Sequence, residues 1–282
     1  IIIAEAGVNH NGDLGLARRM VYAAKEAGAD YVKFQTAVPE LVISTFAPKA
    51  EYQKETTGSD QSQLEMCRAI HLPLADYAGL KELCDSVGIG FMSTPFDLVS
   101  IDCLAGIGMD YWKIPSGEIT NLPYLRKIAS KGGRVILSTG MSTLDEVGAA
   151  VAVLEKGGIS RADITLLHCT TQYPTPYDAV NLRAMDALRT LGCGGVGYSD
   201  HTVGVEVPVA AVAMGATVIE KHFTLDKNMA GPDHRASLSP DELKTMVVMV
   251  RNIERALGSG EKTVADAERP NIEVARKSIV AA

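Results

Sequence analysis

Short apolar runs alternate along the chain with longer segments that carry helical periodicity. The eight runs are three or four residues long, and such continuous stretches are typical of parallel strands buried on both faces. They cover residues 1–4, 31–34, 90–92, 111–114, 135–137, 165–167, 196–198 and 217–219. The segments between them repeat apolar residues every three or four positions, as amphipathic helices do. This strict alternation predicts an α/β protein.

A glycine stands just before each run from the second to the eighth, where a helix would end in a left-handed residue. These are Gly28, Gly88, Gly108, Gly133, Gly158, Gly194 and Gly215. Eight strand–helix units in 282 residues favour a closed (β/α)8 TIM barrel over an open doubly wound sheet. No GxGxxG follows the first run, which further weakens the open dinucleotide-binding alternative. We predict a barrel over residues 1–260.

The remaining residues, 261–282, are polar at first and are predicted to be a linker that leads out of the barrel. The chain begins inside one apolar run and ends directly after another, so we expect it to be part of a longer protein. One connection, over residues 36–76, is unusually long and polar. Long loops at the carboxyl ends of barrel strands are typically lids or binding loops.

Composition and charge narrow the class of protein. Hydrophobic residues make up 46% of the chain, enough for a large aliphatic core, and the net charge is −7. This charge argues against a nucleic-acid or membrane-surface binder. The apolar stretches are too short to span a bilayer, and the start of the chain lacks a secretory signal pattern. Five scattered cysteines without a CxxC motif indicate free thiols, so we expect a cytoplasmic protein.

Polar residues stand at the end of every predicted strand, where a barrel opens into its active-site mouth. They are Glu5, Asn9, His10, Lys33, Gln35, Ser93, Thr94, Lys113, Ser116, Glu118, Ser138, Thr139, His168, Thr170, Tyr173, Ser199, Asp200, His201, Glu220, Lys221 and His222. Lys33 and Lys113 each lie inside an apolar run, which is costly unless an anion meets the ammonium group. With so many hydroxyls nearby, a ligand carrying phosphate and carboxylate is favoured. A structural ion pair and a Schiff-base lysine remain alternatives.

Two histidines end neighbouring strands of the predicted barrel. His201 and His222 could share a divalent ion, with Glu5 on the adjacent first strand. Nitrogen and oxygen ligands with open positions suit manganese, cobalt or iron better than a closed structural zinc site. His168 is interpreted first as a core histidine. After the last strand, a tight turn holds Asp233, which could bind sugar hydroxyls or cap a helix.

Nine motifs together resemble the sialic acid synthase family. They are AEAGVNHNG (4–12), VKFQT (32–36), STPFD (93–97), WKIPSGE (112–118), LSTGM (137–141), HCTTQYPTP (168–176), SDHT (199–202), EKHFT (220–224) and GPDH (231–234). The resemblance runs from the first residue to about residue 278 and includes the legionaminic and pseudaminic acid synthases as near relatives. It implies the same TIM barrel.

The resemblance implies condensation of phosphoenolpyruvate with the open-chain aldehyde of N-acetylmannosamine, giving N-acetylneuraminic acid and phosphate. A divalent metal would be required, Mn²⁺ first, with Mg²⁺ or Co²⁺ as alternatives. Two alternative functions remain. The same reaction could use a related amino-sugar aldehyde, as in a legionaminic or pseudaminic acid synthase, or the barrel could bind a sugar without catalysis. By resemblance, His201 and His222 hold the metal, and Glu118 and Glu5 are the catalytic carboxylates.

The resemblance also assigns the substrate positions. By resemblance, the residues at positions that bind phosphoenolpyruvate are Lys33, Thr94, Lys113, Ser116, Ser138, Tyr173 and Ser199. Thr171 is a further such position, where asparagine is common in the family. The residues at positions that bind the sugar in the family are Glu5, Gln35 and Asp233. Full-length members carry a C-terminal antifreeze-like domain after the linker, swapped across a homodimer. That domain supplies an arginine to the sugar site and is missing here.

Overall fold

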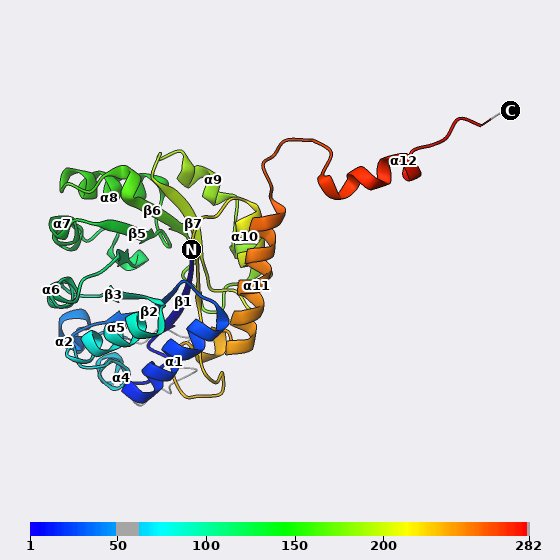
Figure 1. Cartoon of the computed structure of the whole chain (residues 1–282). Coiled ribbons are helices and arrows are strands. Elements are labelled where there is room, and N and C mark those ends of the chain that lie inside the picture. The colour runs from blue at the N-terminus through cyan, green and yellow to red at the C-terminus, as the bar shows by residue number, and fades with distance from the viewer. Residues whose placement is uncertain (49–61, 281–282) are drawn as a thin grey trace.

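Eight parallel strands form the centre of the computed structural model, which describes residues 1–48 and 62–280. They are β1 (Ile2–Gly7), β2 (Tyr31–Thr36), β3 (Gly90–Pro95), β4 (Tyr111–Ile114), β5 (Arg134–Ser138), β6 (Ile164–His168), β7 (Gly195–Asp200) and β8 (Ile219–His222). Hydrogen bonds link them in the order β3-β2-β1-β8-β7-β6-β5-β4, so the first and last strands of the chain are neighbours. The result is a near-closed TIM barrel ringed by helices, as predicted (Figure 1).

The helices follow the strands in turn. The main helices are α1 (Leu14–Ala27), α5 (Asp76–Val87), α6 (Leu98–Ile107), α7 (Leu122–Lys131), α8 (Leu144–Lys156), α9 (Ala184–Arg189), α10 (Glu206–Ala213) and α11 (Pro240–Ala256). Shorter helices are α2 (Pro39–Val42), α4 (Gln63–Ile70), α12 (Ile272–Ala275) and the 3-10 turns η1 (Ser116–Glu118), η2 (Arg161–Asp163), η3 (Tyr177–Ala179), η4 (His234–Ala236) and η5 (Asp266–Asn271). Capping boxes start α8 and α11, where Ser or Thr and a Glu three residues on satisfy free backbone amides.

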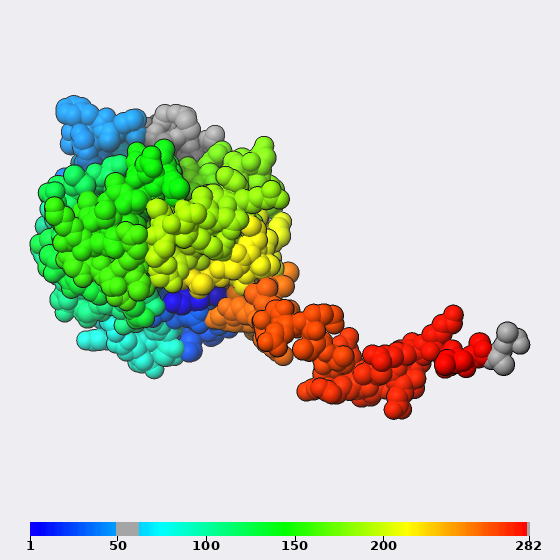
Figure 2. All heavy atoms as spheres, turned by 90° about the horizontal axis from the view of Figure 1, so that it is seen from above, coloured from blue at the N-terminus to red at the C-terminus, as the bar shows by residue number. Residues whose placement is uncertain are grey.

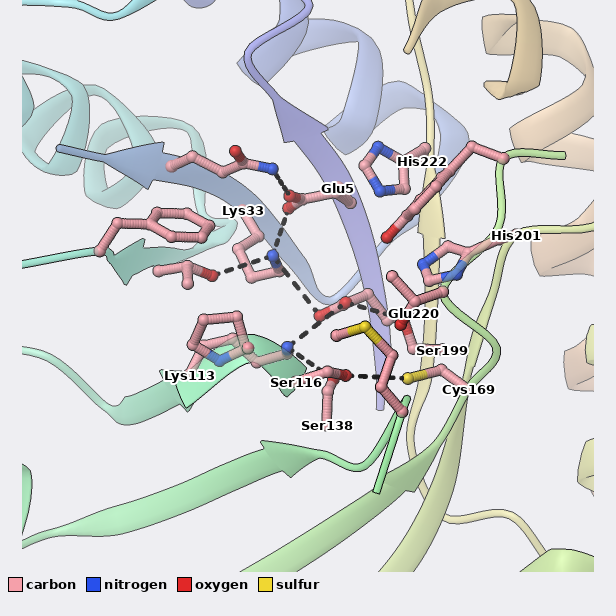
Figure 3. A pocket seen from close by; sticks show the side chains of 18 residues that line it. Glu5, Lys33, Lys113, Ser116, Ser138, Cys169, Ser199, His201, Glu220 and His222 are labelled. Carbon is pink, nitrogen blue, oxygen red and sulfur yellow. Dashed lines mark hydrogen bonds and ion pairs between the residues drawn. The ribbon is translucent and has the colours of Figure 1, made fainter. Parts of the chain in front are cut away.

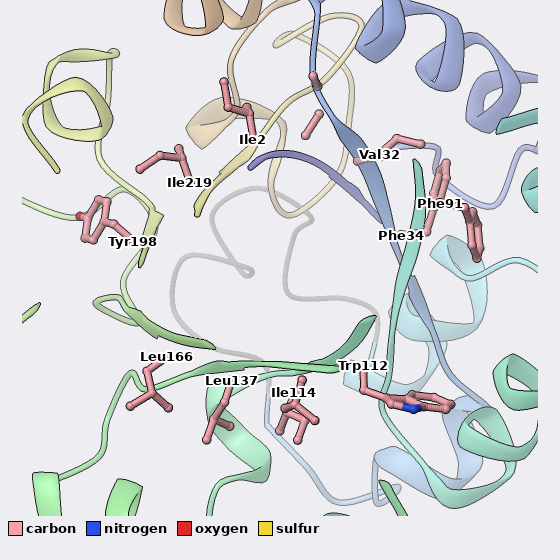
Figure 4. Close-up of a cluster of buried hydrophobic side chains, with 14 of the residues drawn as sticks. Ile2, Val32, Phe34, Phe91, Trp112, Ile114, Leu137, Leu166, Tyr198 and Ile219 are labelled. Atoms are coloured by element: carbon pink, nitrogen blue, oxygen red, sulfur yellow. The ribbon is translucent and has the colours of Figure 1, made fainter. Parts of the chain in front are cut away.

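The two faces of the strands have different tasks. The outward face packs against the helices in one large apolar layer, which includes Ile2, Val32, Phe34, Ile114 and Leu137 (Figure 4). The inward face begins with an apolar plug, formed by Ile3, Met92, Ile136, Leu167 and Val218. Two residues further along each of these strands, on the same face, stand Glu5, Thr94, Ser138, Cys169 and Glu220. The plug therefore forms the floor on which a polar site is built.

The last strand lies two to three residues later than predicted, over Ile219–His222 instead of 217–219. Charged residues obscured it, because Glu220 and Lys221 do not look like members of a buried strand. Lys221 is 1% exposed and forms an ion pair with Asp200 on β7, and its Nζ also donates to the Thr202 carbonyl at 2.6 Å. This pairing lets a lysine occupy the outward face of the strand.

The glycine prediction holds at six of the seven positions, which have positive φ, and is wrong at Gly194. There the left-handed residue is Gly192, with φ of 66°. Gly194 is needed for space instead, because a Cβ at this position would collide with the carbonyl oxygen of Ala162.

Replacement of Gly194 by alanine is expected to lower the free energy of unfolding by about 2 kcal/mol or more, since backbone must move to admit the methyl group. Gly79, inside α5, is the matched control, because a Cβ there would meet no atom within 4 Å. Gly79→Ala should raise stability by about 0.5–1 kcal/mol through helix propensity. Urea unfolding of both variants checks the pair, and equal effects would contradict this account.

The chain leaves the barrel after α11. Residues 257–280 extend away from it and are almost all exposed (Figures 1 and 2). The predicted boundary between residues 260 and 261 stays a prediction. Among the described helices, none combines the length and apolar character needed to cross a bilayer. All five cysteines are unpaired.

Candidate active site

The carboxyl ends of the strands surround a polar cavity of about 200 Å³, shown in Figure 3. All eight strands, or the residues directly after them, contribute to its walls. Twelve of the fourteen site residues predicted from the sequence line it, namely Glu5, Lys33, Gln35, Thr94, Lys113, Ser116, Ser138, Thr171, Tyr173, Ser199, His201 and His222. The fold therefore brings together residues that are up to 217 positions apart in the chain, from Glu5 to His222.

A buried ladder of opposite charges crosses the cavity. Glu220 lies between the two lysines, with Oε2 3.6 Å from Lys33 Nζ and Oε1 3.6 Å from Lys113 Nζ. Lys33 Nζ is also 2.6 Å from Glu5 Oε2. All four side chains are at most 6% exposed. Glu220 had no role in the sequence analysis, although it stands two residues before His222 and so shares its inward face.

The pKa values in this ladder show how the charges are matched. Burial raises the pKa of Glu5, because the nearby Lys33 offsets only part of the desolvation and Glu220 adds a like charge. Burial acts on Glu220 in the same sense, but Lys113 and Lys33 together outweigh it and lower its pKa. Burial lowers the pKa of Lys113, whose charge Glu220 compensates only in part. An anion that enters the cavity would therefore compensate the remaining positive charge of Lys113.

Hydroxyl groups extend this cationic surface. Lys33 Nζ donates to Thr94 Oγ1 at 3.2 Å, and Lys113 Nζ donates to Ser138 Oγ at 2.8 Å. Ser199 Oγ donates to Glu220 Oε1 at 3.0 Å. Ammonium groups surrounded by reorientable hydroxyls suit a phosphate or carboxylate ligand.

A glycine leaves room at one side of this surface. The Gly140 amide donates to Ser116 Oγ at 2.9 Å. A Cβ on Gly140 would collide with Thr171 Oγ1 and lie 2.9 Å from Ser116 Oγ. The missing side chain therefore keeps two hydroxyls open to the cavity. Cys169, whose Sγ lies 3.3 Å from Ser116 Oγ, also lines it. Neither Gly140 nor Cys169 was predicted as a site residue, and only the close approach reveals them.

The two histidines lie beside one another at the cavity wall, with ring centroids 5.7 Å apart and the rings inclined at 60°. His201 Nδ1 donates to the Thr170 carbonyl at 2.6 Å, which leaves its Nε2 as the nitrogen with a free lone pair. His222 Nδ1 is buried and finds no hydrogen-bond partner among the described residues. The ring of Tyr173 packs against both histidines, with its centroid 4.2 Å from the ring centroid of His201 and 5.7 Å from that of His222.

Both imidazoles are in the form that binds metals. Burial lowers the pKa of His201, and burial together with the neighbouring His201 lowers the pKa of His222 further. Neutral imidazoles with free lone pairs fit a divalent ion. Within residues 1–48 and 62–280, no group of three or more His, Cys, Asp or Glu side chains is arranged so that it could hold a metal ion.

The two remaining predicted residues lie outside this cavity. Glu118 ends η1, and its Oε2 accepts from Asn121 Nδ2 at 2.6 Å, while burial raises the pKa of its carboxyl. Asp233 lines a second cavity of about 240 Å³. This cavity shares Gln35, Phe96, Tyr173 and His222 with the first, so the two lie side by side. Burial and the charge of Glu5 raise the pKa of Asp233 to about 7.

This arrangement can hold a multiply charged anion on two lysines, next to a histidine pair that could bind a metal and beside room for a second substrate. It defines a class of TIM-barrel enzyme that joins an anionic substrate to another molecule. The sequence profile of the NeuB family matches residues 20–262, and the chain belongs to this family. Its members are synthases that use phosphoenolpyruvate, an amino sugar and a divalent metal. The resemblance seen in the sequence is confirmed.

Three relatives show how far the similarity extends. The chain is 54% identical to the N,N'-diacetyllegionaminic acid synthase of Campylobacter jejuni, over 100% of this chain and 84% of that protein. It is 52% identical to the synthase of the same name from Legionella pneumophila, over 99% and 79%. The crystal structure of N-acetylneuraminic acid synthetase from Leptospira borgpetersenii, in complex with citrate, superposes with a TM-score of 0.83 at 35% identity, over 97% of this chain and 90% of that chain.

Proposed function

We propose that the protein condenses phosphoenolpyruvate with a diacetamido-trideoxyhexose to give N,N'-diacetyllegionaminic acid and phosphate. The lysine and hydroxyl surface beside His201 and His222 is the observation that carries the reaction. The identities of 54% and 52% to two synthases named for this product, against 35% to the N-acetylneuraminic acid synthetase structure, support the acceptor. The sequence motifs alone favoured N-acetylmannosamine as the acceptor, whereas these identities favour the alternative, a legionaminic acid synthase.

Phosphoenolpyruvate would bind on the two lysines. Lys113, the less compensated cation, and Lys33 provide charge for the carboxylate and phosphate groups. The hydroxyls of Thr94, Ser116, Ser138, Thr171 and Ser199, with that of Tyr173, would donate to their oxygens. Charge-assisted hydrogen bonds of this kind fix a ligand and also stabilise negative charge on a leaving phosphate.

The acceptor would extend from the histidine pair into the second cavity. A divalent ion, proposed as Mn²⁺ on His201 and His222, would polarise the aldehyde when bound. Glu5 and Gln35 are joined by a hydrogen bond of 3.0 Å from Gln35 Nε2 to Glu5 Oε1, and both would engage the sugar near its aldehyde. Asp233 would meet hydroxyl or amide groups further along.

The chemistry then follows from this placement. The methylene carbon of phosphoenolpyruvate forms the new bond to the aldehyde carbon, whose oxygen takes up a proton. Water adds to the cationic carbon left behind, and the carbon–oxygen bond to phosphate breaks. Glu5 lines the cavity where that water would lose its proton. Glu118 is the second proposed carboxylate, at the end of the turn that begins with Ser116.

Two wider predictions from the sequence remain proposals. We propose a homodimer in which a C-terminal domain beyond residue 282 completes the sugar site of the partner, and a cytoplasmic location. Sedimentation of the protein with and without such a domain would test the first.

The acceptor is tested by phosphate release with phosphoenolpyruvate, Mn²⁺ and each candidate sugar. We expect kcat/KM for the diacetamido-trideoxyhexose to exceed that for N-acetylmannosamine by about tenfold or more, the discrimination that one or two apolar groups provide. A preference for N-acetylmannosamine would instead support the prediction made from the sequence, that the product is N-acetylneuraminic acid. Absence of turnover with every 2-acetamido aldose, in protein that retains its fold, would refute the synthase function.

A further inference from the structure

The second cavity has two walls of different origin. One wall is formed by the turn after β8 that carries Asp233. The other is formed by α4, the helix within the long connection between β2 and α5, which contributes Gln63 and three less polar side chains, Met66, Cys67 and Ile70. We call these three side chains the α4 wall. None of the site residues predicted from the sequence lies in α4.

The α4 wall is apolar. It consists of a thioether, a thiol whose pKa burial raises to about 11, and a branched aliphatic chain, so it is uncharged near neutral pH. The charged residues of the helix are directed elsewhere. Arg68 pairs with Glu40 at 2.7 Å outside the cavity, and Glu65 closes the capping box at the start of α4. These three side chains gain by covering methyl groups and offer hydroxyls only a weakly polar thiol. The polar group that α4 adds to this cavity is the Gln63 amide, whose buried Oε1 has no hydrogen-bond partner among the described residues.

The position of this wall is fixed by its neighbours. Gly12, in the turn after β1, approaches the last turn of α4 so closely that a Cβ there would lie 2.6 Å from the Ala69 carbonyl oxygen. His71 Nδ1 donates to the Cys67 carbonyl at 2.9 Å and ends the helix. Ser62 caps the other end. The helix thus has defined supports at both ends, as a selective surface requires.

The side-by-side position of the two cavities sets which end of an acceptor reaches α4. The aldehyde carbon must lie beside the phosphoenolpyruvate surface and the histidine pair. His222 and Tyr173 line both cavities. A sugar whose aldehyde lies there extends its distal carbons into the second cavity. In a diacetamido-trideoxyhexose these carbons carry a second acetamido group and a terminal methyl group, whereas in N-acetylmannosamine they carry hydroxyls.

We propose that the α4 wall is the specificity-determining surface for the distal, methyl-bearing substituents of the acceptor. This inference rests on the proposed function and adds to it the element that selects among acceptors. The residues that bind phosphoenolpyruvate lie in the first cavity, so a change in the α4 wall should alter acceptor choice without altering use of phosphoenolpyruvate.

The test is the double variant Cys67→Ser, Ile70→Thr, which makes the wall polar with little change of shape. Initial rates are measured with both acceptors at saturating phosphoenolpyruvate and Mn²⁺. We expect kcat/KM for the diacetamido-trideoxyhexose to fall about tenfold, that for N-acetylmannosamine to stay level or rise, and KM for phosphoenolpyruvate to stay within about twofold. Arg68→Gln is the matched control on the outer face of the same helix and should leave the ratio of the two acceptors unchanged.

Several outcomes would overturn the inference. An unchanged ratio, or an equal loss with both acceptors, would show that the wall does not select. Circular dichroism reports the fold, and if the double variant does not fold, Cys67→Ser alone should lower the ratio about twofold or more. No change in the ratio of that single variant would also overturn the inference. Failure of the proposed function is a separate result, because the unmodified protein would then turn over neither acceptor.

Discussion

Replacement of His222 by alanine is expected to reduce Mn²⁺-dependent phosphate release about 1,000-fold or more while the barrel stays folded. A metal acting as a Lewis acid contributes several kcal/mol to the barrier, and each 1.36 kcal/mol is a factor of ten in rate. The fold should tolerate the change, because His222 Nδ1 has no hydrogen-bond partner among the described residues and no partner is orphaned. Phosphate-release rates and circular dichroism measure the two effects.

The metal assignment needs a readout apart from activity. Titration calorimetry with Mn²⁺ alone should show tight binding by the unmodified protein and none by His222→Ala. His168→Asn is the control, because His168 Nε2 donates to the Val180 carbonyl at 2.7 Å and His168 does not line the first cavity. Its Mn²⁺ affinity should change less than about twofold. Undiminished Mn²⁺ binding by His222→Ala would remove the histidine pair as the metal site.

The second large effect is expected for Lys113→Met, which should lower kcat/KM for phosphoenolpyruvate about 100-fold. The change removes the less compensated cation of the buried ladder, and a hydrogen bond to a charged group is worth about 1.5–3 kcal/mol. The variant should stay folded, which circular dichroism checks. Methionine keeps the length and apolar stem of lysine. Glu220 keeps its ion pair with Lys33 Nζ, 3.6 Å from Oε2, and the hydrogen bond that Ser199 Oγ donates to Oε1 at 3.0 Å.

Lys127→Met is the matched loss of one positive charge outside the site. Lys127 forms an exposed ion pair with Asp102 at 2.8 Å, and exposed pairs contribute about 0–1 kcal/mol. Lys127→Met should therefore keep kcat/KM for phosphoenolpyruvate within about twofold of the value for the unmodified protein. An equal loss in both variants would mean that net charge, and not the position of Lys113, controls binding. An unaffected Lys113→Met would place phosphoenolpyruvate elsewhere.

The barrel itself could be predicted from the sequence because its signals are local. Buried parallel strands need continuous apolar runs, and β4 was located to the residue, at Tyr111–Ile114. Helices that turn back into strands need left-handed residues, which six of the seven predicted glycines supply. The lysines stood out for a local reason as well, since Lys33 and Lys113 lie in runs that should be apolar.

Prediction was weaker where a charged residue has a distant partner. The eighth strand was placed too early because Lys221 is tolerated there only by Asp200, 21 positions away. The ladder around Glu220 was missed for the same reason, because both of its lysines belong to other strands. The sequence placed Glu220 at the rim of the barrel, but nothing near it indicated that it pairs with the two lysines.

The sequence by itself therefore determined the (β/α)8 architecture, the family, and most of the side chains that surround the cavity. The tertiary structure decided how those side chains are matched: Glu220 between two lysines, Gly140 leaving space for two hydroxyls, and α4 forming one wall of a second cavity. The physical reason is the range of the interactions. Periodicity and capping act within a few residues, whereas charge matching and cavity shape depend on strands that meet only when the barrel closes.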